Sequence, residues 1–423
     1  MKWRDGMRRA LPWLAALGFA ACTDKIAAPG ECPAYCPTGM ITVVDTVLPM
    51  AVYGDSAFGR PVGYVNPFNS LTLLADALPG LRDSRPIFRT TQLLLRLPLS
   101  ADTTTSQVNG VDSIRLRLTI LRRDSAAHNL TISLYKLPLS IDSNTTFGQL
   151  VGPFTDSLIR RVNVDSVIAL PGRRNAAGDS VLVDTTNQRI ILLMAVDSAH
   201  LPIDTPDSGA VALGIRVAAD TLASIAIGSS ENVGTGPLIS WYLRVDSLGI
   251  ATAHRLQTRS PAFDGFVYDP PSPALDSDLT VGGVPSARSV LRVVFPQIIS
   301  DSSRLIRATL ELVPAVAPMG ITADSFGIAA HAAVTDFGAK SPIDLTHVDT
   351  TGVQIGTTDT VKVEVTRLMR YWIGDSLAPH TMVLRQTGEG GNFAEIRFYS
   401  SRDPAHRPLL RLTYSNPFPF GKP

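Results

Sequence analysis

The strongest constraint on the fold is an internal repeat, in which segments of the first half of the chain recur in the second half. Residues 229–239 read SSENVGTGPLI and residues 400–410 read SSRDPAHRPLL, so six residues separate Ser-Ser from Pro-Leu in both copies. An alternating, strand-like pattern follows each copy. Earlier segments match in the same order: 70–76 with 278–283, 93–99 with 290–296, 114–120 with 306–312, and 212–230 with 382–401. A repeat of this kind predicts two structurally related modules.

We expect the first module at residues 41–250 and the second at 260–416, with residues 254–263 spanning the boundary. The chain has 32 Gly and 31 Pro, and Asp-Ser pairs recur along it. These residues favour turns, and short alternating segments between turns indicate strands that bury one face in a two-sheet core. The sequence therefore predicts an all-β protein made of two tandem jelly-roll-like β-sandwich modules.

A single short helix is predicted at residues 365–375 of the second half. Its apolar side chains Leu368, Met369 and Trp372 recur at helical spacing and form one face. Gly374 then favours the end of the helix. We expect this helix to cap one end of the second sandwich.

Four segments of the second half form a recognisable pattern: RSVLRVVFP (288–296), IRATLEL (306–312), VTRLMRYWIGD (365–375) and FYSSRDPAHRPLLRLTY (398–414). With these segments the second half resembles the DNRLRE-type domain of bacterial secreted proteins, a β-sandwich grouped with carbohydrate-binding modules. Asp403 stands where the family more often has Glu, and in the first half Gly236 replaces the Arg that precedes the proline. The resemblance implies secretion, with adhesion or polysaccharide association and usually no catalysis by this domain.

The first 21 residues have the form of an export signal. Residues 1–9 carry four basic side chains, and the apolar run 10–21 suits a signal peptide but is too short to span a bilayer core of about 30 Å. The pair Ala20-Ala21 before Cys22 resembles a bacterial lipobox, which implies a lipid on Cys22. Thr23, rather than Asp, then favours sorting to the outer membrane. The alternative is cleavage by the ordinary signal peptidase, with loss of Cys22.

Residues 22–40 form the predicted tether between the lipid and the first module. Cys32 and Cys36 lie in this Pro-rich segment, where a small disulfide is favoured in an exported protein. A zinc site needs about four ligands, and the neighbouring sequence has no His and no third Cys.

The charge balance argues against a nucleic-acid partner. Without its leader the chain has 34 Lys and Arg against 36 Asp and Glu, so it has no basic excess. The expected partners are the membrane, through the lipid anchor, and a cell-surface or environmental polysaccharide. The anchored protein would face either the periplasm or the exterior.

Catalytic motifs are missing from the sequence. It contains no Gly-x-Ser-x-Gly, P-loop, dinucleotide fingerprint or His-Glu-x-x-His, and its seven histidines are scattered. We therefore expect a non-catalytic, cofactor-free envelope protein that displays its modules for adhesion or polysaccharide binding. The alternatives are a polysaccharide-acting enzyme or its accessory subunit, and a purely structural envelope component.

Three groups of residues are candidate sites. Aromatic side chains in loop-rich stretches could form a ligand platform, whereas Trp241 and Trp372 have core-like contexts. Two carboxylates in PALDSDL could bind calcium or simply be solvated turn residues. The platform residues are Tyr53, Tyr64, Phe68, Phe266 and Tyr268, and the calcium candidates are Asp276 and Asp278.

The third group is the segment 400–408, here called the clasp. Its members Ser400, Arg402, Asp403, Arg407 and Pro408 lie just before the last predicted strand. The copy at 229–237 keeps the serines and the proline but changes the charges, which favours a structural role. We expect Asp403 to pair with Arg402 or Arg407, and we expect the strand that follows to direct Leu410, Leu412 and Tyr414 into the core.

Overall fold

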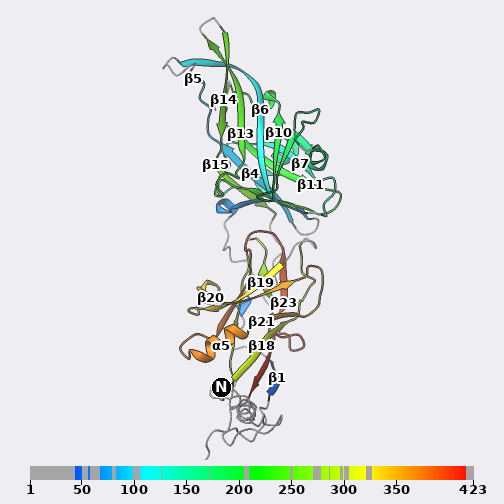
Figure 1. The fold of residues 1–423 in the computed structure, drawn as a ribbon, viewed down its shortest axis with the longest axis vertical. Helices are drawn as coiled ribbons and strands as arrows, with labels where there is room; N and C mark the ends of the chain where they lie inside the picture. Colours follow the sequence, from blue (N-terminus) through cyan, green and yellow to red (C-terminus); the bar gives the residue numbers. More distant parts are fainter. Residues whose placement is uncertain are drawn as a thin grey trace, which may run out of the picture.

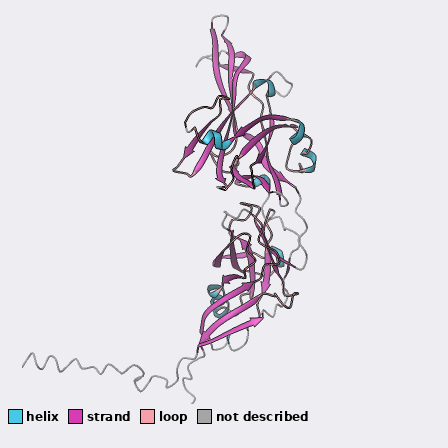
Figure 2. Cartoon of the chain, turned by 90° about the vertical axis from the view of Figure 1, so that its right-hand side faces the viewer, coloured by secondary structure: helices cyan, strands magenta, loops and turns pink. Residues whose placement is uncertain are grey.

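The computed structural model describes residues 43–49, 56–57, 67–78, 82–98, 105–124, 126–170, 172–203, 209–247, 251–269, 278–284, 286–295, 299, 304–320 and 326–415. Strands make up 54% of it and helices 9%, and the strands form several antiparallel sheets. The prediction of an all-β sandwich fold is thereby confirmed. The molecule is elongated, with two strand-rich bodies arranged along its long axis (Figures 1 and 2).

Module one contains strands β3 to β15. Its main sheet has the order β14-β13-β6-β12-β3-β4-β11-β7-β8, and β15 pairs with β4. The strand bounds are β3 (Thr72–Leu78), β4 (Arg82–Thr90), β5 (Arg96–Pro98), β6 (Thr105–Arg123), β7 (Thr131–Leu137), β8 (Leu158–Asn163), β9 (Ser180–Asp184), β10 (Arg189–Val196), β11 (Ala212–Ala218), β12 (Ala223–Gly228), β13 (Leu238–Ser247), β14 (Ala251–Arg259) and β15 (Pro261–Tyr268). Short helical turns connect them: η1 (Pro67–Asn69), η2 (Gly148–Leu150), α2 (Pro153–Asp156), α3 (Val164–Ile168) and η3 (Ser198–His200).

Module two contains strands β16 to β24 together with the two N-terminal strands. Its sheets have the orders β1-β24-β18-β21, β2-β17-β22-β19-β20 and β16-β23. The bounds are β1 (Val43–Pro49), β2 (Ser56–Ala57), β16 (Asp278–Gly282), β17 (Ser289–Arg292), β18 (Arg304–Leu312), β19 (Phe326–Ala333), η4 (Gly338–Lys340), β20 (Ile343–Val353), β21 (Val361–Glu364), α5 (Thr366–Gly374), β22 (Thr381–Gln386), β23 (Glu395–Tyr399) and β24 (Leu409–Ser415).

The module boundaries predicted from the repeat are wrong at both ends of module one. Strand β1 pairs along its whole length with β24, from Val43 opposite Ser415 to Pro49 opposite Leu409, and β2 pairs with β17. Strands β14 and β15, expected at the boundary, instead pair with β13 and β4 of module one. Only three residues separate Ser247 from Ala251, so β14 pairs with β13 directly after it in the sequence. In module two the equivalent edge of β24 pairs with β1 instead.

The strand pairing nevertheless follows the repeat. In module one β12 pairs with β3 and β13 with β6, and in module two β23 pairs with β16 and β24 with β18. Strand β11 pairs with β4 as β22 pairs with β17. In module one β14 pairs with β13 and β15 pairs with β4. In module two β1 pairs with β24 and β2 pairs with β17. Strands β14 and β15 therefore occupy the same positions in module one as β1 and β2 do in module two.

One of the predicted sequence matches is not supported by the pairing. Residues 93–99 match 290–296 in sequence, but β4, rather than the segment around β5, occupies the position of β17. Two buried serines show that β4 corresponds to β17. The Ser84 hydroxyl donates to the carbonyl of Leu74 at 2.7 Å, and the Ser289 hydroxyl donates to the carbonyl of Thr280 at 2.8 Å.

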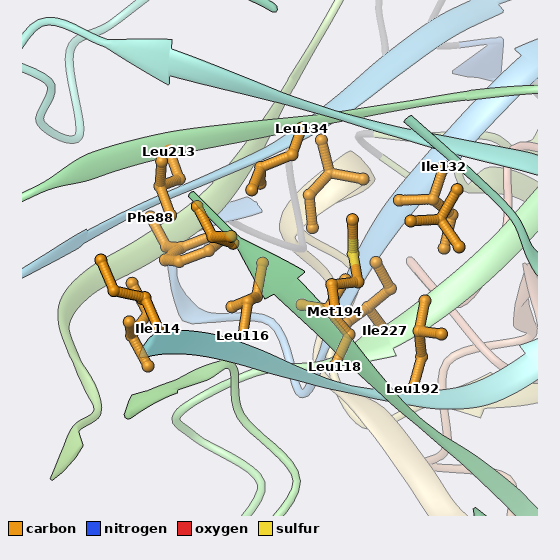
Figure 3. Close-up of a cluster of buried hydrophobic side chains, with 14 of the residues drawn as sticks. Phe88, Ile114, Leu116, Leu118, Ile132, Leu134, Leu192, Met194, Leu213 and Ile227 are labelled. Atoms are coloured by element: carbon orange, nitrogen blue, oxygen red, sulfur yellow. The ribbon is translucent and has the colours of Figure 1, made fainter. Parts of the chain in front are cut away.

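Each module has its own apolar core. In module one the inward side chains of β6 and β10 pack together (Figure 3). Trp241 of β13 belongs to the same core and is fully buried. In module two the core includes Trp372 of α5, and Leu410, Leu412 and Tyr414 of β24. The core assignment of both tryptophans and the inward face of the last strand are therefore confirmed.

Helix α5 agrees with the sequence prediction. It buries Leu368, Met369 and Trp372 on one face, and Asp375 forms its C-cap. Arg370 donates to the carbonyls of Leu305 and Ile306 in β18, at 3.4 and 2.9 Å. These hydrogen bonds hold the helix against one edge of module two.

The two modules share a third apolar cluster. Phe393 of module two packs edge-on against Tyr268 of module one, with ring centroids 5.5 Å apart, and also contacts Phe266. Arg122 of module one donates to the carbonyl of Gly391 at 3.2 Å. Burial of several large side chains at this junction favours contact between the two modules.

Candidate functional site

The clasp is an ordered turn that connects β23 to β24. Ser400 is buried, and its carbonyl accepts a hydrogen bond from the N–H of Asp403 at 3.1 Å. The carboxylate of Asp403 accepts the N–H groups of Ala405 and His406 at 2.9 and 3.1 Å. These local bonds are typical of aspartate in turns, and they explain why a polar segment can precede a core strand.

Module one builds the same turn from different side chains. The carbonyl of buried Ser229 accepts the N–H of Asn232 at 3.2 Å, the same three-residue step as in the clasp. Ser230 then donates its N–H and its hydroxyl to Asp264 of β15, at 2.7 and 2.8 Å. Burial raises the pKa of Asp264, although the hydrogen bonds from Ser230 act in the opposite direction.

Asp403 of the clasp contacts a side chain that the sequence did not predict. His406 Nδ1 lies 3.3 Å from Asp403 Oδ1, and the His406 ring stacks on Tyr399 with centroids 4.6 Å apart. Burial alone would raise the pKa of Asp403, but the backbone N–H groups of Ala405 and His406 and the His406 side chain lower it. Asp403 therefore stays ionised while it organises the loop.

A pocket of about 520 Å³ lies beside the clasp, within the size range of small-ligand sites. It brings the calcium candidate Asp278 together with clasp residues, because Asp278 of β16 pairs directly with Tyr399 of β23. The lining residues are Asp278, Ala315, Val316, Tyr399, Ser400, Arg402, Asp403 and Pro404. An aromatic ring beside a guanidinium, carboxylates and a hydroxyl can contact both the apolar and the polar groups of a sugar.

The described residues do not form a coordination shell for the predicted calcium ion. Asp278 is largely buried, and Asp276 lies outside them. Within the parts of the chain that the structure describes, no three His, Cys, Asp or Glu side chains are grouped so that they could hold a metal ion.

The aromatic platform predicted before each sandwich is wrong for Phe266, whereas Phe68 and Tyr268 are half-buried. Phe266 is only 1% exposed and lies with Tyr268 in the cluster between the modules. Phe68 stacks on Phe263 with ring centroids 5.4 Å apart. Phe266 and Tyr268 face other protein side chains because they lie in β15, which pairs with β4 of module one, and Phe68 of η1 packs on Phe263 of the same strand.

Several predicted residues lie outside the described part of the chain. They are Cys22, Cys32, Cys36, Tyr53 and Tyr64, together with the predicted signal peptide and tether. Among the described residues, the helices are too short or too polar for any of them to cross a membrane.

Sequence reasoning missed the aromatic part of the pocket. Tyr399 and His406 are seven positions apart and stack only because the clasp folds back on β23. Ala315 and Val316 come from the segment after β18, which bridges to β23 through the Pro314–Phe398 contact. The alternation of Phe398 and Tyr399, inward then outward, was the one usable signal.

Comparisons with known proteins do not extend this description. No family model matches the chain, and no curated protein matches it.

Proposed function

We propose that this chain is a non-catalytic lipoprotein of the cell envelope that displays two related β-sandwich modules for adhesion or polysaccharide binding. The proposal includes a relationship of the modules to the DNRLRE-type domains. The equivalent strand pairing supports a relationship between the two modules. The proposed relationship to the DNRLRE-type domain rests on the resemblance of segments 288–296, 306–312, 365–375 and 398–414.

The observation that carries the proposal is the pairing of β1 with β24. It brings both ends of the described chain to the same end of the molecule, while module one extends away from that end (Figure 1). A lipid on Cys22 would hold module two next to the membrane and present module one farther out. On the solvent face, Arg411 of β24 lies between Asp45 of β1 and Glu311 of β18, with N–O distances of 3.4 and 3.2 Å.

Fractionation and surface labelling test the anchoring. The wild-type chain should sediment with the outer membrane, and Cys22→Ala should release it. An epitope inserted between Ser247 and Ala251, at the hairpin connecting β13 and β14, should be more accessible than one in the N-terminal tether. Unchanged fractionation of Cys22→Ala would reject the lipid anchor.

A glycan array tests the binding role of the clasp pocket. Tyr399→Ala and Arg402→Ala should lose a saccharide signal that the wild-type chain gives. Exposed Leu377→Ala, in the same module but outside the pocket, is the matched control. No saccharide signal from the wild-type chain would argue for a purely structural role.

A further inference from the structure

A second pocket, of about 480 Å³, lies in module one and is lined in part by residues of β6, β13 and η3. Strand β5, which pairs with the first residues of β6, lies toward the end of module one farthest from module two (Figure 1). We propose that this pocket binds a small carboxylate with an apolar body, such as the C-terminal residue of a peptide or a short aliphatic acid. This inference goes beyond the proposed function and does not depend on the clasp pocket or the lipid anchor.

Two irregularities of strand β6 shape this pocket. The register between β13 and β6 shifts between Tyr242 and Leu243 and again between Arg244 and Val245. Asp112 and Asn109 are the extra residues at these two β-bulges. Bulges redirect side chains, and both of these lie within residues 109–112.

The two bulges lie opposite Arg244, whose guanidinium lies at the wall of the pocket. Arg244 Nε lies 3.0 Å from Asp112 Oδ1, and His254 Nδ1 lies 2.6 Å from the other carboxylate oxygen. Asp112 therefore orients Arg244 from one side. A guanidinium has five N–H donors, so its Nη groups can still donate to a ligand anion.

Gly110 provides the space in which the guanidinium lies. A Cβ atom at this position would be 2.6 Å from Arg244 Nη2 and 3.1 Å from its Cζ. Any larger residue would force the guanidinium to move. The pairing of Gly110 with Arg244 across the strands thus fixes where the charge is presented.

The other lining residues favour a ligand with an apolar body. Apolar side chains form much of the wall, notably Leu95, Val111 and Ile203, with Ser198 and Gln107 as uncharged polar neighbours. None of the described residues that line it is aromatic, so a stacked sugar ring is disfavoured. One cation beside an apolar wall matches a monocarboxylate with a hydrocarbon side chain.

The test is a saturation-transfer NMR titration of the full chain with three probes. N-acetyl-L-leucine represents a peptide C-terminus, hexanoate represents an aliphatic acid, and N-acetyl-L-leucinamide lacks the charge. At least one acid should bind, and the amide should bind about tenfold more weakly or worse, as expected for loss of a charge-assisted hydrogen bond. Binding of N-acetyl-L-leucine alone identifies a peptide terminus, and binding of both acids identifies a general apolar carboxylate site.

Amino-acid substitutions test whether the acids bind in this pocket. Arg244→Gln should weaken acid binding about tenfold or more, and Gly110→Ala should weaken it by displacing the guanidinium while the melting temperature stays close to wild type. Arg115→Gln, on the same outer face of β6 but outside the pocket, should bind as wild type does. Equal affinity for the acid and the amide, no binding of either acid, or full affinity in both Arg244→Gln and Gly110→Ala would overturn the proposal.

Discussion

The two modules are built from equivalent strands, but they complete their sheets in different ways. Module one uses β14 and β15, which follow its last repeated strand directly in the sequence. Module two uses β1 and β2 from the start of the chain, and β1 lies more than 360 positions from its partner β24. Module one is therefore inserted into module two, and only module two depends on the meeting of the two chain ends.

The largest expected effect comes from removing the N-terminal strands. Deletion of residues 43–57 leaves module one complete but exposes the hydrogen-bonding edges of β24 and β17. Module two should lose its cooperative unfolding transition, whereas module one should keep its own. Hydrogen exchange by mass spectrometry distinguishes them, because protection should fall in β18 and β24 and remain in β6 and β13. Equal loss of protection in both modules would contradict the asymmetry.

The junction between the modules gives the next largest effect. Phe393→Ala removes a 7%-exposed ring from the shared apolar cluster, which should cost about 3–5 kcal/mol of unfolding free energy. It should also lower the calorimetric melting temperatures of both modules. Phe337→Ala, at a ring that is 67% exposed, serves as the control and should change little. Unshifted melting temperatures for Phe393→Ala would mean that the modules do not stabilise each other.

A smaller effect, confined to module two, is its response to acid. Buried His331 accepts a hydrogen bond from Arg385 at Nε2 (3.0 Å), and Nδ1 lies 2.9 Å from the carbonyl of Asp344, so the ring is neutral. Burial lowers the pKa of His331 below 6.5. Because the unfolded chain then binds the proton more readily, stability is lost as the pH falls below 6.5 toward the folded-state pKa. Each tenfold difference in proton affinity between the unfolded and folded chains costs about 1.4 kcal/mol of unfolding free energy.

Urea unfolding of module two between pH 7.5 and 5 measures this response. His331→Gln should flatten the pH dependence over that range, whereas exposed His128→Gln in module one should leave it unchanged. A pH dependence that persists in His331→Gln would assign the acid sensitivity to other groups.

The smallest expected effects are in the clasp. Asp403→Ala removes the acceptor for two backbone N–H groups and the partner of His406, so it should lower the melting temperature of module two slightly. Arg407→Ala should lower it less and leave ligand binding unchanged. Thermal unfolding of both variants ranks them, and a larger loss for Arg407→Ala would indicate that Arg407 contributes more to the loop than Asp403 does.

The sequence predicted what depends on local pattern. Alternation and turn residues indicated the strands, helical spacing indicated α5, and the matched segments indicated which strands correspond. Trp241 and Trp372 were correctly assigned to the cores because each lies on an apolar face.

The sequence could not predict features that depend on which distant strands pair in the folded protein. Strand β1 could pair with the last strand of either repeat, and only the short β13–β14 connection decides between them. For the same reason Phe266 was mistaken for an exposed ring. The clasp pocket was only partly predictable, because Asp278 and Tyr399 become neighbours through strand pairing.

An engineered cross-link between β1 and β24 tests the central claim most directly. Asp45 and Thr413 are paired across these strands and both reach solvent, with Thr413 Oγ1 3.3 Å from Asp45 Oδ1. In a chain whose three native cysteines are replaced by serine, Asp45→Cys and Thr413→Cys should form an intramolecular disulfide under mild oxidation, detected by peptide mass spectrometry. The cross-link should raise the melting temperature of module two alone. Failure to form it, or formation only between two chains, would contradict closure of module two by its own N-terminal strand.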